Sequence, residues 1–304
     1  MKIAIIGAGA MGCLYGAMLS ESDNEVWLLD VWEQHIDAIK KNGLIVEKSS
    51  QQKKYANLKA TINALEIGSV DMAMIFVKST LTEDAVRKNS CIFTDKTIAL
   101  TLQNGLGNIE KISQTVDKKN IIAGTTAHGS TMLGPGKIRH AGEGKTIIGE
   151  LDGVDSERIK GIAEVFRISG LETEISYNVI GLIWDKLLVN VGINALTAIT
   201  QMNNGDLVKY PEIEEILEAA VKEAFMVAQV KGIKLGYCDP IAHTKDVCRA
   251  TAANKSSMLQ DVLNKRKTEI DMINGAIVRE GKTLGVNTPV NMVLANLVKW
   301  KQNL

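Results

Sequence analysis

The first twelve residues of the chain constrain its fold more than any later stretch. Lys2–Ile6 is a short β-rich run, and Gly7, Gly9 and Gly12 follow it in the spacing G-x-G-x-x-G, at the start of a helical stretch. Strand, glycine turn and helix in this order predict the opening of a doubly wound α/β sheet with a dinucleotide site. The glycines allow, in turn, a tight turn, a close approach of the pyrophosphate, and close packing of the helix on the strand. We expect the whole loop to bind the cofactor, namely Gly7, Ala8, Gly9, Ala10, Met11 and Gly12.

A carboxylate at the end of the second predicted strand bears on which dinucleotide binds. Asp30 directly follows the strand Glu25–Leu29, at about the distance after Gly12 where the ribose-binding residue is expected. A carboxylate there accepts hydrogen bonds from ribose hydroxyls and repels a 2′-phosphate, whereas NADP sites usually carry an Arg. The charge therefore favours NAD over NADP. Asp30 could at the same time cap a helix that begins at Trp32.

Further apolar runs extend the predicted sheet. Met72–Val77 and Thr97–Leu102 are continuously apolar, as parallel strands are when both faces of the sheet are covered. Lys78 directly follows the first run, and Asn104 lies just after the second. Ligands of open α/β sheets bind at the carboxyl ends of the strands, so Lys78 and Asn104 are candidate cofactor-binding residues. The alternative is a surface lysine and a turn asparagine.

The rest of the first half continues the α/β pattern. Lys48–Lys54 is predicted as a polar loop and Ile121–Thr126 as one more strand. A turn at Gly134-Pro135-Gly136 and a strand at Lys145–Gly149 suggest an antiparallel addition to the sheet. Strand and helix stop alternating near Tyr177.

We therefore predict an α/β Rossmann-type N-terminal domain followed by an all-α C-terminal domain. The boundaries are 1–176 for the dinucleotide-binding domain and 177–304 for a helical domain that binds substrate and could support dimerisation. The predicted helices of the second domain are Ile183–Thr200, Pro211–Lys231, Asp239–Ala250, Thr268–Leu284 and Pro289–Asn303.

A polar ladder interrupts the first of these helices, which is otherwise apolar nearly all round. Lys186, Asn190 and Asn194 recur every four residues, so all three share one face. A buried ammonium and two buried amides are costly unless they are paired. From the helix alone, a solvated face or partners within the protein explain the ladder as well as a ligand does.

A second polar segment lies between two later helices. It contains Asn254, Ser256 and Ser257, and then Glu269 and Asp271. The serines suit a helix N-cap, and the carboxylates suit the positive N-terminal end of the next helix. That structural role leaves unexplained why so much polarity accumulates in an apolar domain.

Composition excludes several classes of partner. Lys and Arg number 35, equal to Asp and Glu, so the formal net charge of this 304-residue chain is zero. This balance removes the usual electrostatic argument for nucleic acid or an anionic membrane. The four cysteines have no metal-binding spacing, and we expect no metal, with His128 and His140 structural. With no signal-peptide pattern and no apolar run long enough to span a membrane, we expect a cytoplasmic protein.

Taken together, these motifs resemble the ketopantoate reductase (2-dehydropantoate 2-reductase) family along nearly the whole chain. The glycine loop is shared by many dehydrogenases, whereas the last two motifs are specific to the family. The matching features are Gly7 to Gly12, Val77-Lys78, Gln103-Asn104-Gly105-Leu106-Gly107, Trp184-Asp185-Lys186-Leu187 with Asn190 and Asn194, and Ser256 to Asp261 with Thr268 to Gly275.

The resemblance implies reduction of 2-dehydropantoate to pantoate by NADP or NAD, on the route to pantothenate. It implies a site in a cleft between the two domains, with Lys186 as the catalytic general acid. Glu269 would support this lysine and contact the ligands, and Lys78 and Asn104 would lie near the nicotinamide. The substrate-binding residues would be Asn190, Asn194, Asn254 and Ser257.

Two alternatives stay open at this point. Family members that use NADP typically carry an Arg after the second strand, where this chain has Asp30. A branch of NAD-dependent D-2-hydroxyacid dehydrogenases that act on branched or aromatic 2-keto acids resembles the chain more closely there. The more distant alternative is a dinucleotide sensor without catalysis, which would lack parts of the catalytic group. A small 2-keto acid is the expected partner, and a homodimer is possible.

Overall fold

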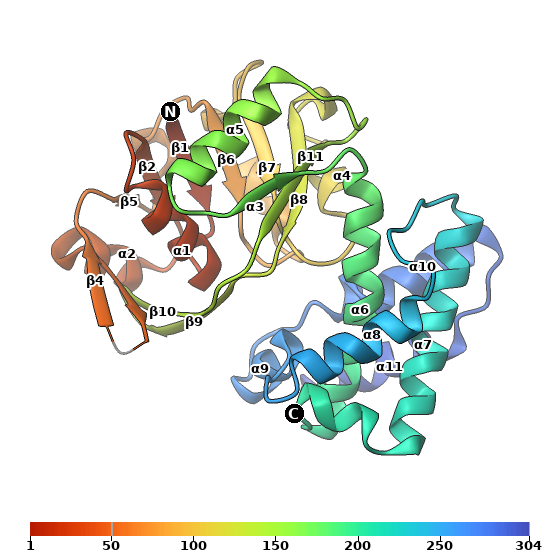
Figure 1. The fold of residues 1–304 in the computed structure, drawn as a ribbon. Helices are drawn as coiled ribbons and strands as arrows, with labels where there is room; N and C mark the ends of the chain where they lie inside the picture. The colour runs from red at the N-terminus through yellow and green to blue at the C-terminus, as the bar shows by residue number, and fades with distance from the viewer. Residues whose placement is uncertain (50, 304) are drawn as a thin grey trace. The chain divides into compact units, whose positions relative to one another are not determined.

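Two compact units divide the chain in the computed structural model (Figure 1). The first contains residues 1–103 and 108–179, and the second contains Asn104–Gly107 and the chain from Ile180 onward. The structure describes residues 1–49 and 51–303. Ser50, inside the predicted loop Lys48–Lys54, and Leu304, the last residue of the second predicted domain, lie outside the described residues.

An eight-stranded sheet is the centre of the first unit. Its order is β12-β11-β8-β7-β6-β1-β2-β5, and the six strands from β8 to β5 are all parallel. These six have the strand order of the doubly wound dinucleotide-binding fold, which confirms the predicted fold class. β11 joins β8 antiparallel, as predicted. The strands are β1 (Lys2–Ile6), β2 (Glu25–Leu29), β5 (Lys59–Thr61), β6 (Met72–Ile75), β7 (Ile98–Thr101), β8 (Ile121–Thr126), β11 (Thr146–Glu150) and β12 (Thr173–Ile175).

Both faces of this sheet are covered, which explains why its strands are apolar without alternation. Ile3 and Ile5 of β1 lie in a core with residues of α1 and α5, whereas Ala4 and Ile6 lie in a separate core on the opposite face. The helices are α1 (Ala10–Leu19), α2 (Glu33–Asn42), α3 (Thr82–Lys88), α4 (Asn108–Ile112) and α5 (Glu157–Ile168), with short 3₁₀ turns η1 (Ala64–Glu66), η2 (Ser90–Ile92) and η3 (Lys118–Asn120).

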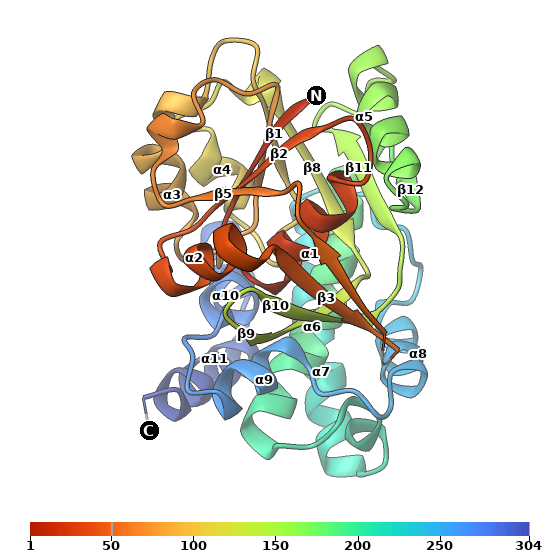
Figure 2. The ribbon, with the colours of Figure 1, turned by 90° about the vertical axis from the view of Figure 1, so that its left-hand side faces the viewer.

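A second, four-stranded sheet was not predicted. Its order is β4-β3-β10-β9, and it packs against α1 (Figure 2). The predicted polar loop Lys48–Lys54 is wrong, because β4 begins within it and pairs antiparallel with β3. The side chains of β4 are mostly exposed, so this strand carries no apolar signal. The strands are β3 (Leu44–Lys48), β4 (Gln51–Tyr55), β9 (Gly129–Gly134) and β10 (Lys137–Gly142).

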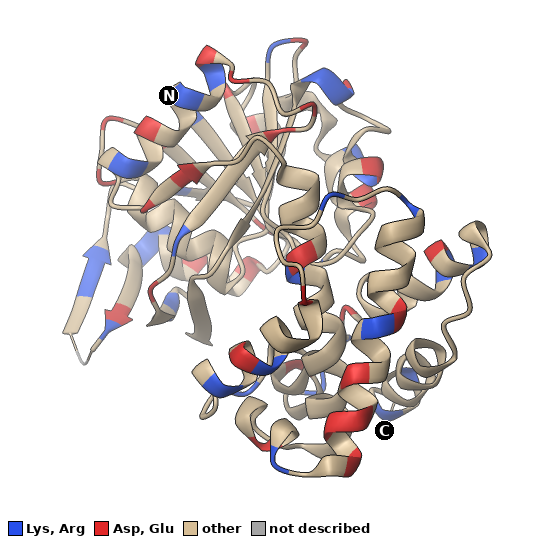
Figure 3. Ribbon diagram, turned by 45° about the vertical axis from the view of Figure 1, so that its right-hand side comes forward, with Lys and Arg blue, Asp and Glu red and all other residues tan. Residues whose placement is uncertain are grey.

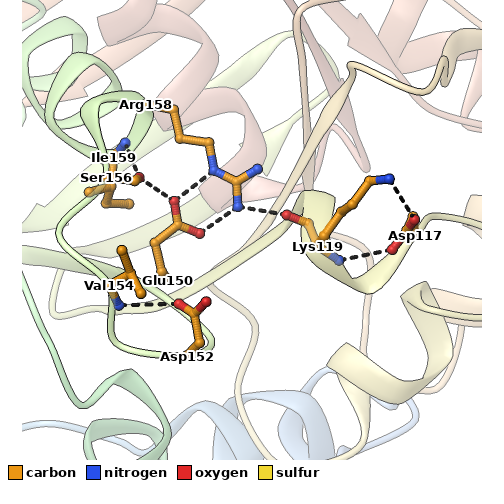
Figure 4. Close-up of polar contacts among 8 residues, drawn as sticks. All are labelled: Asp117, Lys119, Glu150, Asp152, Val154, Ser156, Arg158 and Ile159. Atoms are coloured by element: carbon orange, nitrogen blue, oxygen red, sulfur yellow. Dashed lines mark hydrogen bonds and ion pairs between the residues drawn. The ribbon is translucent and has the colours of Figure 1, made fainter.

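An ion pair between the buried Glu150 and the partly exposed Arg158 fastens the end of β11 to the start of α5 (Figure 4). The guanidinium of Arg158 donates to both carboxylate oxygens of Glu150, at 2.6 and 2.5 Å, and to the backbone oxygen of Lys119 at 2.7 Å. Ser156 caps α5 by accepting the Ile159 N–H and donates to Glu150 as well. Burial alone would raise the pKa of Glu150, but Arg158 and Ser156 outweigh it, so that the pKa is lowered and the pair stays charged.

The second unit is built of helices around one apolar core. Trp184, Leu188 and Val191 of its first helix lie in this core with residues of every later α-helix. The elements are α6 (Val179–Thr200), η4 (Asn204–Val208), α7 (Pro211–Val230), α8 (Pro240–Ala250), α9 (Ser257–Leu263), η5 (Ile270–Met272), α10 (Asn274–Leu284) and α11 (Pro289–Lys301).

Helix α6 is the longest helix that the structure describes, and it is apolar along its length. By length and composition alone it could cross a membrane, since the mean hydropathy of its most apolar window is 1.5, but 61% of that window is buried inside the protein. A core helix of a globular unit passes the same test. Burial against α7 to α11 accounts for the apolar composition of α6.

The predicted continuous helix Thr268–Leu284 is wrong. The chain forms the short turn η5, breaks at Ile273 (φ −110°, ψ −98°), and only then begins α10. The amide of Asn274, which is fully buried, donates to the Val191 oxygen of α6 at 3.1 Å and to the Asn291 side chain at 3.0 Å. These tertiary hydrogen bonds fix the segment beside α6 in a shape that a continuous helix does not have.

Candidate active site

The glycine loop lies where the strand order of the main sheet reverses, between β1 and β6. Gly7 has φ +99°, and a Cβ there would lie 2.6 Å from the Val77 nitrogen, so only glycine fits. A Cβ on Gly12 would lie 2.0 Å from the Gly7 oxygen, which shows how closely α1 approaches the end of β1. A Cβ on Gly9 would meet nothing within 4 Å. Two glycines are therefore required by the protein itself, whereas Gly9 borders open space.

The start of α1 suits an anionic group. Gly9 is the N-cap, Ala10 and Met11 follow it, and the first turn contains no acidic residue. The first backbone N–H groups of a helix have no partner within the helix and lie at its positive end. The loop of Gly7, Ala8, Gly9, Ala10, Met11 and Gly12 thus fits a pyrophosphate in both shape and charge.

Asp30 is held rigidly beside the same loop. Its carboxylate accepts the Ala8 N–H at 2.7 Å and the Trp32 N–H at 3.0 Å. The helix-capping alternative is wrong in detail, because α2 begins at Glu33 and its N-cap is Trp32, with no capping side chain. The neighbouring Val31 is 92% exposed, so an uncharged side chain stands where NADP sites carry an Arg. The residues present fit a dinucleotide with an unphosphorylated ribose.

The strand-end candidates fall into different units. Lys78, after β6, is half-buried in the α/β unit, whereas Asn104 groups with the helical unit. The loop of Asn104 is fastened there, because the Leu106 N–H donates to the Met272 oxygen at 2.9 Å. A Cβ on Gly105 would lie 2.4 Å from the same oxygen, so only glycine allows this approach.

Gln103 is a residue of this region to which the sequence analysis gave no role. Its amide donates to the Val77 oxygen at 2.5 Å and to the Thr82 hydroxyl at 2.9 Å, and its oxygen accepts from Thr101 at 2.9 Å. It therefore ties the ends of β6 and β7 together immediately before Lys78 and Asn104. Its place in the Gln-Asn-Gly-Leu-Gly motif was the available signal.

The polar ladder of α6 is only partly solvated. Lys186 and Asn190 are half-buried, and Asn194 is 4% exposed, while Trp184 and Leu187 beside them lie in the core. Asp185, the remaining polar residue of the motif, accepts the Gly236 N–H at 2.9 Å and so anchors the loop before α8. A face that points fully into solvent is therefore excluded as the explanation of the ladder.

Lys186 and Glu269 form an electrostatically coupled pair. Burial lowers the pKa of the Lys186 ammonium to about 8, and the negative charge of Glu269 acts in the opposite direction. Glu269 is 9% exposed and stands at the N-cap of η5, the segment that Asn274 holds beside α6. The structure thus brings together two charged side chains that are far apart in the sequence. A lysine with a pKa near neutrality can donate a proton and remain charged until it does.

The two serines of the second polar segment have different environments. Ser256 is the N-cap of α9, accepting the Leu259 N–H at 3.1 Å, and its hydroxyl lies 2.7 Å from the Thr197 hydroxyl of α6. Ser257 is exposed on the first turn of α9, and Asn254 is exposed just before it. The structural role therefore belongs to Ser256, and Ser257 and Asn254 present their side chains to solvent within the same unit as the ladder.

Basic and acidic residues are interspersed along both units (Figure 3), in line with the zero formal net charge. Across residues 1–49 and 51–303, no group of three or more His, Cys, Asp or Glu side chains could hold a metal ion.

The fold and the glycine loop define the class: an α/β dinucleotide-binding protein with a helical C-terminal unit. Comparison with known proteins identifies the family. Residues 3–153 match the family model described as ketopantoate reductase PanE/ApbA, and residues 178–302 match the model of its C-terminal part. The chain therefore belongs to the ketopantoate reductase family, which confirms the resemblance seen in the sequence.

Relatives match over their full length. The 2-dehydropantoate 2-reductase of Pyrococcus horikoshii is 36% identical over 100% of this chain and 98% of its own, and that of Halobacterium salinarum is 34% identical over 99% of each. Among solved structures, a ketopantoate reductase of Ralstonia eutropha JMP134 has a TM-score of 0.91 at 34% identity, covering 100% of this chain and 99% of its own. A D-mandelate dehydrogenase with NADH and anilino(oxo)acetate has a TM-score of 0.94 at 34% identity, with the same coverage.

Proposed function

We propose that this protein reduces 2-dehydropantoate to pantoate with a reduced nicotinamide dinucleotide, and that Lys186 supplies the proton. The observation that carries the proposal is the coupled pair of Lys186 and Glu269 in a chain whose full-length relatives are named 2-dehydropantoate 2-reductases. In this proposal residues 1–176 bind the dinucleotide and residues 177–304 bind the substrate.

The chemistry asks for a proton donor beside the reacting oxygen. The bound cofactor supplies the hydride, which leaves negative charge on the carbonyl oxygen of the keto acid. The Lys186 ammonium stabilises that charge and then donates its proton to the oxygen. Because burial has lowered its pKa to about 8, Lys186 is still charged at neutral pH but gives up its proton more readily than an exposed lysine. Glu269 keeps the lysine protonated before reaction.

The substrate is a small anion that carries a hydroxyl group. Amide and hydroxyl groups can donate to its carboxylate and accept from its hydroxyl. Asn190 follows Lys186 after four residues and Asn194 follows Asn190 after four more, so all three lie on the same face of α6. We assign substrate binding to these two residues and to the exposed Asn254 and Ser257.

The cofactor residues fit NAD(H) better than NADP(H). We assign the pyrophosphate to the glycine loop, Gly7 to Gly12, and the adenosine ribose to Asp30, whose carboxylate is fixed by the Ala8 and Trp32 N–H groups. A fixed negative charge at this position disfavours a 2′-phosphate. Lys78, Asn104 and Glu269 are assigned to the nicotinamide end.

Two observations favour a second candidate, an NAD-dependent D-2-hydroxyacid dehydrogenase acting on a branched or aromatic 2-keto acid. Asp30 suits NAD, and the structure is similar, with a TM-score of 0.94, to a D-mandelate dehydrogenase that was solved with NADH. Both candidates use the same proton donor. They differ in the substituent that the keto acid carries beside its keto group.

A steady-state comparison tests the proposal and separates the candidates. The purified protein is assayed with NADH and NADPH, each against ketopantoate, 2-ketoisovalerate and phenylglyoxylate. The proposal expects the highest kcat/KM with ketopantoate and NADH. A preference for phenylglyoxylate would favour the second candidate. No oxidation of either cofactor with any keto acid would contradict both and leave a dinucleotide sensor.

The helical unit also supports a homodimer. Val293, Leu297 and Trp300 recur on one face of α11 and are 51%, 43% and 64% exposed. Burying such a stripe against its own copy would remove apolar surface from water. Trp300→Asp should then shift the sedimenting species from dimer to monomer. A monomeric wild type would contradict the dimer, and a variant that stays dimeric would exclude this face of α11 as the interface. A cytoplasmic location accords with relatives that carry this biosynthetic name.

A further inference from the structure

We propose that His35 is a positioning residue for the cofactor loop, which it supports through the thiol of Cys13 and the Ala8 peptide. This inference rests on the proposed dinucleotide site, because it assigns a role in cofactor affinity to residues that would not touch the cofactor. It concerns the α/β unit alone.

The contacts of the His35 ring determine its tautomer. His35 lies on α2 and is fully buried, and its Nδ1 accepts the Gly136 N–H at 3.0 Å. An Nδ1 that accepts carries no proton, so the proton of the neutral ring is on Nε2. Nε2 lies 3.3 Å from the sulfur of Cys13, which is also fully buried. His35 therefore donates from Nε2 while it accepts at Nδ1.

Cys13 connects His35 to the glycine loop. Its thiol donates to the Ala8 oxygen at 3.1 Å, and the N–H of Ala8 donates to Asp30 at 2.7 Å. Burial, and secondarily the charge of Asp30, raises the pKa of the Cys13 thiol, which keeps the proton that this bond needs. The loop residue Ala8 is thus held at its oxygen by Cys13 and at its nitrogen by the carboxylate proposed to bind the ribose.

The chain of contacts begins in the second sheet. Gly136 lies in the turn between β9 and β10, has φ +70°, and approaches α2 so closely that a Cβ would lie 3.1 Å from that of Ala38. Its N–H donates into the His35 ring from the side away from the loop. The second sheet therefore braces a loop that belongs to the first sheet, which gives this addition to the doubly wound fold a role in cofactor binding.

The neutral form of His35 is the one that fits. Burial lowers the pKa of the His35 imidazole, while the charge of Asp30 and the Ala8 carbonyl act in the opposite direction. Protonation would place an Nδ1–H against the Gly136 N–H and remove the acceptor. The titratable side chains that face the ring are Asp30 and Cys13, and the Trp32 ring stacks on it at a centroid distance of 5.0 Å and an angle of 10°.

Equilibrium binding of NADH to variants tests this role without relying on turnover. We expect His35→Phe, which keeps a ring but removes both nitrogens, to raise the NADH Kd about tenfold. The matched control is His243→Phe in the helical unit, whose ring stacks on Tyr237, and which should leave the NADH Kd unchanged. Cys13→Ala should weaken NADH binding as well, whereas Cys13→Ser, which keeps a donor to Ala8, should restore most of it.

The pH dependence of NADH binding separates positioning from general loss of structure. In the wild type, burial lowers the pKa of His35, so the NADH Kd should rise only once the pH is well below the ordinary histidine pKa of about 6.5. In Cys13→Ala this rise should be smaller, because the thiol link to Ala8 is already broken. If His35→Phe does not fold, the Cys13 variants decide. Wild-type affinity in both His35→Phe and Cys13→Ala, or equal loss in Cys13→Ser and Cys13→Ala, would overturn the inference. A wild type that binds no NADH at any pH would instead contradict the proposed cofactor site.

Discussion

The cofactor loop of the α/β unit and the polar ladder of the helical unit are built by opposite means. The loop uses backbone groups and the absence of side chains: Gly7 and Gly12 leave no room for a Cβ, and the nearest charge, Asp30, is fixed by backbone N–H groups. The ladder uses side chains, above all the half-buried Lys186, whose pKa depends on burial and on Glu269. Substitutions in the loop should therefore change affinity or folding, whereas substitution of Lys186 should change the rate of the chemical step.

Removing the ammonium should give the largest effect. Lys186→Met keeps most of the length of the side chain but removes its charge and proton, so kcat for keto acid reduction should fall by about 10³-fold or more. The NADH Kd should stay within about twofold, because the loop is untouched. Steady-state kinetics and NADH titration measure the two quantities, with Lys222→Ala on the exposed face of α7 as the control. Near-normal kcat in Lys186→Met would remove this lysine from the mechanism.

Two alanine substitutions in the loop should separate affinity from folding. Gly9→Ala adds a methyl group that meets nothing in the protein, so the melting temperature should change little. The NADH Kd should rise by up to about a hundredfold, because the methyl group blocks the approach of the pyrophosphate. Gly12→Ala places a Cβ 2.0 Å from the Gly7 oxygen and should destabilise the unit itself. Thermal unfolding and NADH titration distinguish them, and equal melting temperatures for both variants would contradict the geometry.

Asp30 should have a smaller and selective effect. Asp30→Ala removes the proposed ribose acceptor and the charge that repels a 2′-phosphate, so NADH should bind about tenfold more weakly and NADPH should lose less, or gain. The ratio of the two Kd values is the measurement. An equal loss for both cofactors would mean that Asp30 serves only to hold the Ala8 and Trp32 N–H groups.

The adjacent serines should show the smallest effects, one on the free energy of unfolding and the other on the KM. Ser256→Ala removes the N-cap of α9 and should reduce the free energy of unfolding by about 1 kcal/mol. Ser257→Ala, on the exposed first turn, should leave that free energy unchanged and raise the KM for the keto acid several-fold. Chemical denaturation and steady-state kinetics measure the pair. An unchanged KM in Ser257→Ala would exclude Ser257 from the substrate site.

The features predicted from the sequence are the local ones. Strand, glycine turn and helix in the first twelve residues, the apolar parallel strands, and the periodic ladder of α6 all depend on neighbours in the chain, and the structure contains each of them. The break at Ile273 was not predicted, because the apolar pattern continues through it and its cause is the buried Asn274 bonding across to α6. β4 was missed because its exposed polar residues resemble a loop.

The candidate site residues could be named from the sequence, but the electrostatic coupling between them could not. Lys186 stood out by spacing, yet its lowered pKa depends on burial by distant helices and on Glu269. The support of the loop by His35 and Cys13 was out of reach of the sequence, because their bonds join α2, α1 and a turn of the second sheet. A histidine in the short polar helix α2 carries no local sign of this role.

The pH dependence of kcat for keto acid reduction tests the central claim most directly. If Lys186 is the proton donor, the wild-type rate should be constant at neutral pH and fall as the pH rises through about 8, the pKa of the ammonium. Glu269 raises that pKa, so Glu269→Gln should move the fall to lower pH, whereas Asp271→Asn, a nearby carboxylate paired with Lys299 at 2.6 Å, should leave it in place. A wild-type rate that stays flat to pH 10, or a profile that Glu269→Gln does not move, would contradict the account.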